Sequence, residues 1–156
     1  MSAPLSSLRI LDFSTLLPGP FASMLLADLG AEVLRIESTN RPDLVRMLRS
    51  KAKGGSATHA TLNRSKHSLA LNLKHPDAVK IVQQLVGKYD IVLEQFRPGV
   101  MRRLGLDYEE LSMHNHALIF CSLTGYGQTG PYRNRAGHDL NYLALSGVSN
   151  YSRRKN

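Results

Sequence analysis

The chain has 156 residues, of which 42% are hydrophobic and 21% charged, and it carries 20 Lys and Arg against 12 Asp and Glu. These values are ordinary for a globular protein with one domain and its own core. No apolar run reaches the roughly 18 residues that a membrane span requires, so we expect no membrane contact. The net charge of +8 favours anionic partners, without distinguishing nucleic acid, phosphorylated cofactors and acidic lipids.

The first 36 residues predict a strand, a helix and a second strand. Residues 8–13 form a short apolar run typical of a buried strand, and Pro18-Gly19-Pro20 ends it. Residues 21–29 carry apolar side chains at helical spacing, and residues 31–37 resemble another strand. Two buried strands joined by a helix indicate a parallel pair with a right-handed crossover. The glycine pattern of a dinucleotide site is absent from the turn.

The remaining chain continues this alternation after one long interruption. Residues 38–65 are polar and basic, and we predict a surface excursion with a helical turn near residues 44–48. We predict strands at residues 68–73, 91–94 and 118–123, helices at 77–89, 100–104, 108–113 and 139–146, and a glycine-rich loop at 124–137. This order predicts an α/β fold, an open, mostly parallel Rossmann-like sheet with helices on both faces.

Cys121 is the one cysteine of the chain and lies in the apolar run 118–123. We interpret it as a buried, inert thiol, because free cysteine usually packs as a small hydrophobic residue. A lone cysteine fits a reducing, intracellular setting, and residues 1–7 lack the features of a secretory signal. We expect a cytoplasmic protein, or a peroxisomal or mitochondrial one in a eukaryote.

Two segments next to predicted strands are candidate ligand sites. Arg64 and Lys66 stand before strand 68–73, where a planar guanidinium and a point charge suit phosphate, although a solvated basic edge is equally compatible. Phe96 and Arg97 follow strand 91–94, and ligands of open parallel sheets collect beyond the carboxyl ends of strands. We therefore favour ligand contact at Phe96 and Arg97 over a Pro-Gly turn with exposed flanks.

His138 lies between the glycine-rich loop and the predicted helix 139–146. Its imidazole can accept and return a proton near neutral pH. With Asp139 as the N-cap, the helix dipole would favour a neutral ring and attract anionic oxygens, although a satisfied structural histidine is the alternative. The other five histidines lack this setting, and no Cys/His spacing suggests a metal site.

Together these segments resemble the class III CoA-transferase family, which includes formyl-CoA transferase, carnitine CoA-transferase and alpha-methylacyl-CoA racemase. The matching stretches run in order over nearly the whole chain, at residues 11–20, 26–33, 63–66, 71–74, 96–99 and 124–131. Residues 137–142 are most similar to the racemase branch, because transferase members commonly carry a tyrosine where this chain has His138.

The resemblance implies an acyl-CoA substrate and no covalently bound cofactor. It assigns the catalytic proton transfer to His138, and it assigns contacts with the nucleotide, phosphates and thioester of CoA to Arg41, Arg64, Lys66, Phe96, Arg97, Arg103, Gly125, Tyr126 and Gly127. In the family, the second proton carrier of racemases and the aspartate nucleophile of transferases lie further along the sequence. Family members are longer and form interlocked homodimers, so we expect residues 1–156 to be the N-terminal part of the CoA-binding α/β domain, truncated relative to the family.

We expect an alpha-methylacyl-CoA racemase-like protein that acts by 1,1-proton transfer and is incomplete as this chain. One alternative is a CoA-transferase that moves CoA between carboxylic acids. The other is a non-catalytic CoA-binding fragment, whose exposed apolar edges would promote association. Nucleic-acid binding is not favoured, because the sequence shows no interleaved aromatic and basic surface.

Overall fold

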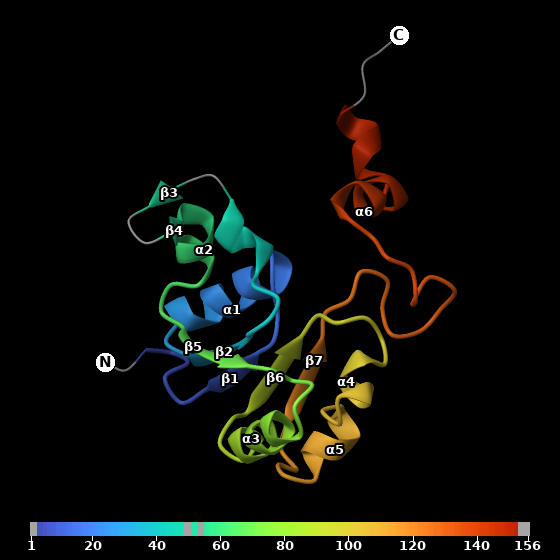
Figure 1. Cartoon of the computed structure of the whole chain (residues 1–156). Helices are drawn as coiled ribbons and strands as arrows, with labels where there is room; N and C mark the ends of the chain where they lie inside the picture. Colours follow the sequence, from blue (N-terminus) through green and yellow to red (C-terminus); the bar gives the residue numbers. More distant parts are fainter. Residues whose placement is uncertain (1–2, 49–50, 53–54, 153–156) are drawn as a thin grey trace.

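A five-stranded parallel sheet forms the centre of the protein (Figure 1). The computed structural model describes residues 3–48, 51–52 and 55–152. The strand order is β5-β2-β1-β6-β7, with every pairing parallel. The strands are β1 (Arg9–Asp12), β2 (Glu32–Ser38), β5 (His67–Leu71), β6 (Ile91–Glu94) and β7 (Ile119–Ser122). A short antiparallel ribbon pairs β3 (Lys51–Ala52) with β4 (Gly55–Ser56).

Helices lie on both faces of the sheet, as Figure 1 shows. One face carries α1 (Pro18–Asp28) and α2 (Ala57–Leu62), and the other carries α3 (Pro76–Val86), α4 (Val100–Arg103) and α5 (Tyr108–Ser112). The short helix α6 (Asp139–Leu145) and the 3-10 turn η2 (Val148–Ser152) stand away from the sheet, and a second 3-10 turn, η1 (Leu44–Met47), follows β2. None of these helices, within the described residues, has the length and apolarity to cross a bilayer.

The sheet separates two apolar cores. Ile10 packs toward α1 with Ala27 and Val33, whereas its neighbour Leu11 packs toward α3 with Val82. Successive side chains of a strand point to opposite faces, so a strand covered on both sides must be apolar throughout. This requirement explains why β1 appears in the sequence as a continuous apolar run.

The predicted α/β sheet with helices on both faces is confirmed, and two local expectations need correction. Residues 38–65 contain the predicted helical turn as η1, but they also form the β3–β4 ribbon and α2, which were not predicted. Cys121 is exposed, so the buried, inert thiol was wrong. β7 is an edge strand whose two faces differ: Phe120 packs against the α3 side, while Ile119, on the same face as Cys121, is 58% exposed.

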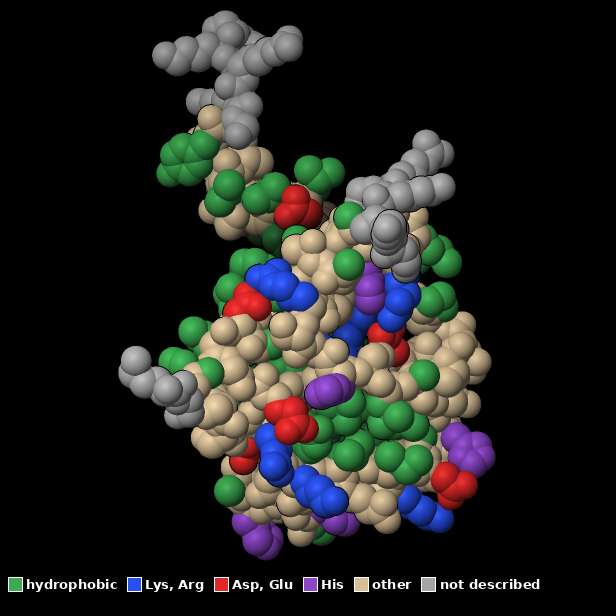
Figure 2. Space-filling view, turned by 90° about the vertical axis from the view of Figure 1, so that its left-hand side faces the viewer, with side chains coloured by type: hydrophobic (Ala, Val, Ile, Leu, Met, Phe, Trp, Pro, Cys, Tyr) green, Lys and Arg blue, Asp and Glu red, His purple; other side chains and the backbone are tan. Residues whose placement is uncertain are grey.

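The opposite edge of the sheet is β5, whose Leu69 and Leu71 are only half-buried. Figure 2 views the molecule from this side, and hydrophobic side chains gather there between charged ones of both signs. Among the described residues on this face, the basic side chains are scattered among acidic ones.

Candidate functional site

The strand order creates a switch point between β1 and β6. The chain proceeds from β1 outward through β2 to β5, then returns to the other side of β1 to form β6 and β7. Two turns leave the carboxyl ends of the strands at this point: the β1 turn (residues 13–17) and the β6 turn (residues 95–99). Gln95 Nε2 donates to Thr15 Oγ1 at 3.3 Å and links the two turns. Open α/β sheets bind ligands at such a place.

The β1 turn is held from below by the buried carboxylate of Asp12. One carboxylate oxygen accepts hydrogen bonds from the backbone N–H of Ser14 (2.8 Å) and from its hydroxyl, and the other accepts from the Ser23 hydroxyl. At Gly19, a Cβ atom would lie 2.2 Å from the Ser14 Cβ. This close approach explains the glycine as a requirement of the tight strand-to-helix turn.

Lys66 belongs to the same buried network. Its Nζ donates to the Pro20 carbonyl and to Ser23 Oγ, both at 2.8 Å, and lies 3.7 Å from Asp12 Oδ2. Burial lowers the pKa of Lys66 to about 8, although the Asp12 carboxylate opposes this shift. The side chain is 1% exposed, so the ammonium group points inward. The predicted phosphate contact therefore requires Lys66 to leave this network.

Arg64 is exposed and bound by a carboxylate from α1. Its Nε and Nη2 form a bidentate pair with Asp28, and Nη1 donates to the Thr61 carbonyl at 3.0 Å. The Asp28 side chain is partly exposed and has Arg64 as its specific partner. Surface pairs of this kind contribute little to stability, so a phosphate can compete for the guanidinium.

The β6 turn is organised by Glu94, a residue to which the sequence analysis assigned no role. Its carboxylate accepts from the Phe96 N–H at 2.7 Å and from the Ser122 hydroxyl. Burial raises the pKa of Glu94, and these two hydrogen bonds oppose the rise. Phe96 is half-buried against the α3-side core, and Arg97 is exposed. A polar residue ending an apolar strand was the one available signal for Glu94.

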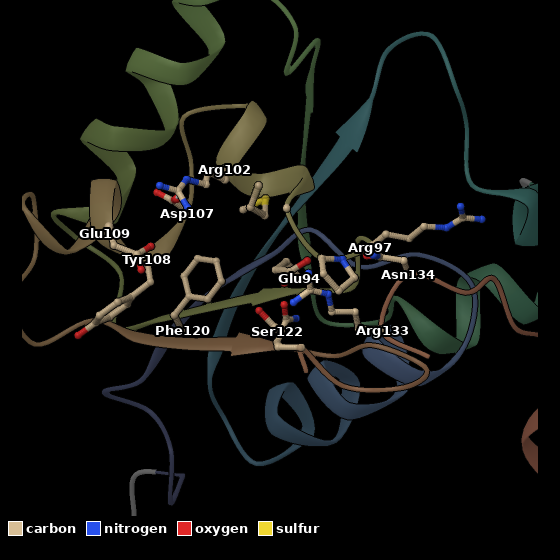
Figure 3. A pocket seen from close by; sticks show the side chains of 14 residues that line it. Glu94, Arg97, Arg102, Asp107, Tyr108, Glu109, Phe120, Ser122, Arg133 and Asn134 are labelled. Atoms are coloured by element: carbon tan, nitrogen blue, oxygen red, sulfur yellow. The ribbon is translucent and has the colours of Figure 1, made fainter. Parts of the chain in front are cut away.

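A pocket of about 560 Å³ opens beside the β6 turn (Figure 3). Its walls come from the carboxyl ends of β6 and β7, from α4 and α5, and from residues 128, 133 and 134 of the glycine-rich loop. Phe120 lies in the middle of the view and makes an edge-to-face contact with Tyr108, with ring centroids 6.3 Å apart. The guanidinium-bearing residues that line the pocket are Arg97, Arg102 and Arg133. The pocket thus combines an aromatic wall with three guanidinium groups and the carboxylates of Glu94, Asp107 and Glu109.

Of the nine predicted CoA contacts, Arg97 alone is among the pocket residues that the structure describes, and two of the others, Arg41 and Arg103, are exposed. Arg103 is on α4 beside the lining residue Arg102 but is not among the pocket residues that the structure describes. Arg41 follows β2, where its backbone N–H donates to Ser38 Oγ at 3.1 Å. Both side chains are accessible to a ligand.

His138 is exposed at the start of α6. It is itself the N-cap, so the expectation that Asp139 caps the helix was wrong: the His138 backbone N–H donates to Asn141 Oδ1 at 2.9 Å, and Asp139 is the first helical residue. His138 does not line the pocket described above. Among the predicted site residues, the pocket thus includes Arg97 but not the catalytic histidine.

The predicted thioester-bordering segment is folded onto aromatic rings. Tyr126 packs edge-to-face against Tyr132 and Tyr142, with ring centroids 5.7 Å and 5.3 Å apart. The Arg135 guanidinium lies 4.5 Å from the centroid of Tyr132. Gly125 and Gly127 flank Tyr126 and are exposed. Among the described residues, no cluster of three His, Cys, Asp or Glu side chains is arranged to hold a metal ion.

Comparison with known proteins identifies the family. Residues 5–156 match the family model described as CoA-transferase family III. The chain belongs to this family. It is 42% identical over 146 residues to the succinyl-CoA:glutarate CoA-transferase of Homo sapiens, covering 93% of this chain and 33% of that protein. It is also 42% identical over 144 residues to the human alpha-methylacyl-CoA racemase, covering 92% of this chain and 34% of that one.

Two solved structures share the fold of this chain. A hypothetical protein from Mycobacterium tuberculosis superposes with a TM-score of 0.88 and 34% identity, covering 99% of this chain and 42% of that one. A CAIB/BAIF family protein from Brucella suis gives a TM-score of 0.88 and 35% identity, covering 95% and 40%. The chain thus spans about a third of the length of the curated relatives that it matches.

Proposed function

We propose that this chain is the CoA-binding part of a CoA-transferase that acts on thioesters of small carboxylic acids. The matches support this choice, because they begin with succinyl-CoA:glutarate and succinyl-CoA:L-malate CoA-transferases and the racemases follow. His138 predicts a racemase, whereas the matches favour the alternative, a CoA-transferase.

One observation carries the proposal: the pocket at the β6 turn has arginines around an aromatic wall. CoA joins negatively charged phosphates to a flat purine and a thin pantetheine arm. Guanidinium groups such as Arg97 and Arg133 pair with phosphate through parallel hydrogen bonds. The rings of Phe120 and Tyr108 offer a surface for a flat group. The pocket thus offers groups for both the phosphates and the purine of CoA, and its carboxylates, Glu94, Asp107 and Glu109, leave the arginines as the phosphate-binding groups.

The contribution of these residues to group transfer is binding and orientation. CoA transfer by this family proceeds through a carboxylate that attacks the thioester, and the resemblance places that aspartate beyond residue 156. Holding the thioester in one geometry converts an encounter between molecules into a reaction within a complex. Arg41, Arg64, Lys66, Phe96, Arg97, Arg103 and residues 125–127 remain predicted CoA contacts. The homodimer and the cellular compartment also remain predictions.

Isothermal titration calorimetry with CoA tests the proposal. We expect wild-type protein to bind CoA, and Arg97→Ala or Arg133→Ala to weaken binding about tenfold, equivalent to about 1.4 kcal/mol. Lys80→Ala is the matched control, because Lys80 is an exposed cation on α3 whose partner is Asp77. Titrations with pantetheine, which lacks the phosphates, should not distinguish the arginine variants. Absence of CoA binding by the wild type would contradict the proposal.

The exposed His138 supports a second candidate, the racemase. A base there could remove the α-proton of an acyl-CoA, and deuterium exchange from D₂O into 2-methylacyl-CoA would report it. Exchange lost in His138→Ala supports a racemase, whereas CoA transfer from succinyl-CoA to glutarate supports a transferase. One imidazole serves one face of the carbon, so we expect no sustained two-way inversion from this chain alone. CoA binding without either reaction would indicate a binding fragment.

A further inference from the structure

Leu16, in the middle of the β1 turn, has a left-handed backbone conformation with φ of 62°. Among the described non-glycine residues it shares a positive φ only with Ser65. Bulky side chains avoid this region, because Cβ crowds the following carbonyl oxygen. Leu16 and Leu17 are 41% and 58% exposed, so burial in the core does not explain the strain. The strained residue instead faces solvent at the switch point, where ligands bind.

The carboxylate of Asp43 holds this conformation. The Leu16 N–H lies 3.2 Å and 3.3 Å from the two carboxylate oxygens, although the residues are 27 positions apart. The same carboxylate accepts from the Val45 N–H at 3.0 Å, at the start of η1. The Asp43 side chain is 1% exposed. The buried carboxylate of Asp43, the N-cap residue of η1, thus binds the β1 turn.

Arg35 holds Asp43 in place. Its guanidinium forms an ion pair with Asp43, and it also contacts His59 Nε2 at 2.8 Å and Glu37 Oε1 at 3.4 Å. Arg35 is 1% exposed and stands opposite Asp12 in the β1–β2 ladder, so the pair lies beside the end of β1. Burying two charges carries a large desolvation cost, and such pairs serve specificity of structure better than stability.

We infer that Asp43, backed by Arg35, is a positioning residue that keeps the β1 turn in its strained form at the ligand site. The strain is retained because a charged carboxylate accepts the Leu16 N–H in that form alone. The turn then presents Leu16 and Leu17 beside the β6 turn, to which Thr15 is hydrogen-bonded. The contact of these side chains with an acyl-CoA rests on the proposed function. The role of Asp43 in holding the turn is independent of it.

Amide hydrogen exchange and a rescue experiment test whether Asp43 holds the β1 turn in its strained conformation. We expect the Leu16 amide to be protected in the wild type and to exchange at least about tenfold faster in Asp43→Asn, because the charged acceptor and its ion pair are lost. Leu16→Gly in the Asp43→Asn background should restore much of the urea midpoint, since glycine adopts positive φ without strain. Leu17→Gly is the matched control: Leu17 has φ of −116°, so no rescue is expected.

Two results would overturn this assignment. One is an unchanged exchange rate of the Leu16 amide in Asp43→Asn, and the other is equal rescue by Leu16→Gly and Leu17→Gly. If Asp43→Asn does not fold, the urea midpoints of Leu16→Val and Leu17→Val are compared with each other in the wild-type background. A β-branched residue resists positive φ, so only Leu16→Val should lower the urea midpoint substantially. Equal midpoints for these two variants contradict the assignment.

A CoA titration tests the link between the β1 turn and ligand binding separately from the proposed function. If the wild type binds CoA, Asp43→Asn should bind it about tenfold more weakly while remaining folded, because the turn is no longer held at the site. Unchanged affinity together with lost Leu16 protection would refute the link between turn and ligand. Failure of the wild type to bind CoA would refute the proposed function alone, because the exchange and rescue measurements need no ligand.

Discussion

The phenol ring of Tyr142 lies directly against Gly125: a Cβ atom at Gly125 would stand 2.1 Å from the Tyr142 hydroxyl oxygen. The same ring covers Gly137, where a Cβ would be 2.7 Å from the ring. Both ends of the glycine-rich loop therefore close on one aromatic side chain of α6. His138 follows Gly137 directly, so this contact also determines where the histidine lies.

Gly125→Ala should open this loop. The added methyl group cannot coexist with the Tyr142 ring, and overpacking of this kind costs about 1–3 kcal/mol. Because α6 stands away from the sheet, we expect local loosening, seen as faster hydrogen exchange and proteolysis within residues 124–145. Gly87→Ala is the control, since Gly87 has φ of −62° and its nearest Cβ neighbour would be at 3.5 Å. Equal behaviour of the two variants contradicts this account.

Removing Lys66 should destabilise the whole domain. Lys66→Ala leaves the Asp12 carboxylate buried without its cation, and loss of one member of a buried pair costs about 3–5 kcal/mol. The measurement is the free energy of unfolding in urea. Lys80→Ala deletes an exposed cation with an exposed partner and should change it by less than about 1 kcal/mol. A comparable loss in both variants would falsify the inward placement of Lys66.

Acid should remove a stabilising contribution of Glu37. Burial opposes ionisation, but hydrogen bonds from Arg46 and Ser68 and the charge of Arg35 lower the pKa of Glu37 from 4.5 to about 2. The folded state thus holds the charged form more strongly than the unfolded state. Its contribution is complete above pH 4.5 and is lost as the pH falls toward 2. The stability difference between wild type and Glu37→Gln should shrink over that interval.

Ser68→Ala provides the control for this pH dependence. The Ser68 hydroxyl donates to Glu37 Oε1 at 2.8 Å, so its removal weakens one of the interactions that lower the pKa. In the Ser68→Ala background, the difference in free energy of unfolding between proteins with Glu37 and with Glu37→Gln should therefore disappear at a higher pH than in the wild-type background. An identical pH profile with and without the Ser68 hydroxyl would argue against this origin of the shift.

Releasing Arg64 from Asp28 tests its predicted contact with CoA. Asp28→Asn should change stability by at most about 1 kcal/mol, because the pair is exposed. If Arg64 binds a CoA phosphate, Asp28→Asn should raise CoA affinity in calorimetry, since the competing carboxylate is gone, and Arg64→Ala should lower it. Unchanged CoA affinity in both variants would contradict the contact and would indicate that Arg64 only links α1 to the end of α2.

The regular elements were predictable because their signals are local. β1, β2 and β6 were placed within one or two residues, since strands covered on both faces need continuous apolar runs. The predicted helix 77–89 corresponds to α3, which begins at Pro76. Within residues 38–65 only a helical turn near residues 44–48 was predicted, and η1 lies there. Their short elements are organised by Arg35, Asp43 and His59, which are distant in sequence, and no periodicity records such contacts.

The candidate site divides in the same way. Sequence reasoning placed Phe96 and Arg97 beyond a strand end, where the structure has the β6 turn. It did not find the role of Glu94, because a buried acid and an exposed one look alike in a sequence. Both Lys66 and Arg64 were predicted to contact phosphate, whereas Lys66 points into the interior and Arg64 to the surface.

The amino-acid order by itself determined the family resemblance, the strand and helix alternation and the turns that end the strands, because periodicity and turn residues act between near neighbours. Tertiary structure alone decided which lysine is buried, which carboxylate holds Leu16 and which face of β7 leaves Cys121 exposed. Those outcomes depend on the distances between segments that meet only after folding, since burial and charge pairing arise from contacts across the sheet.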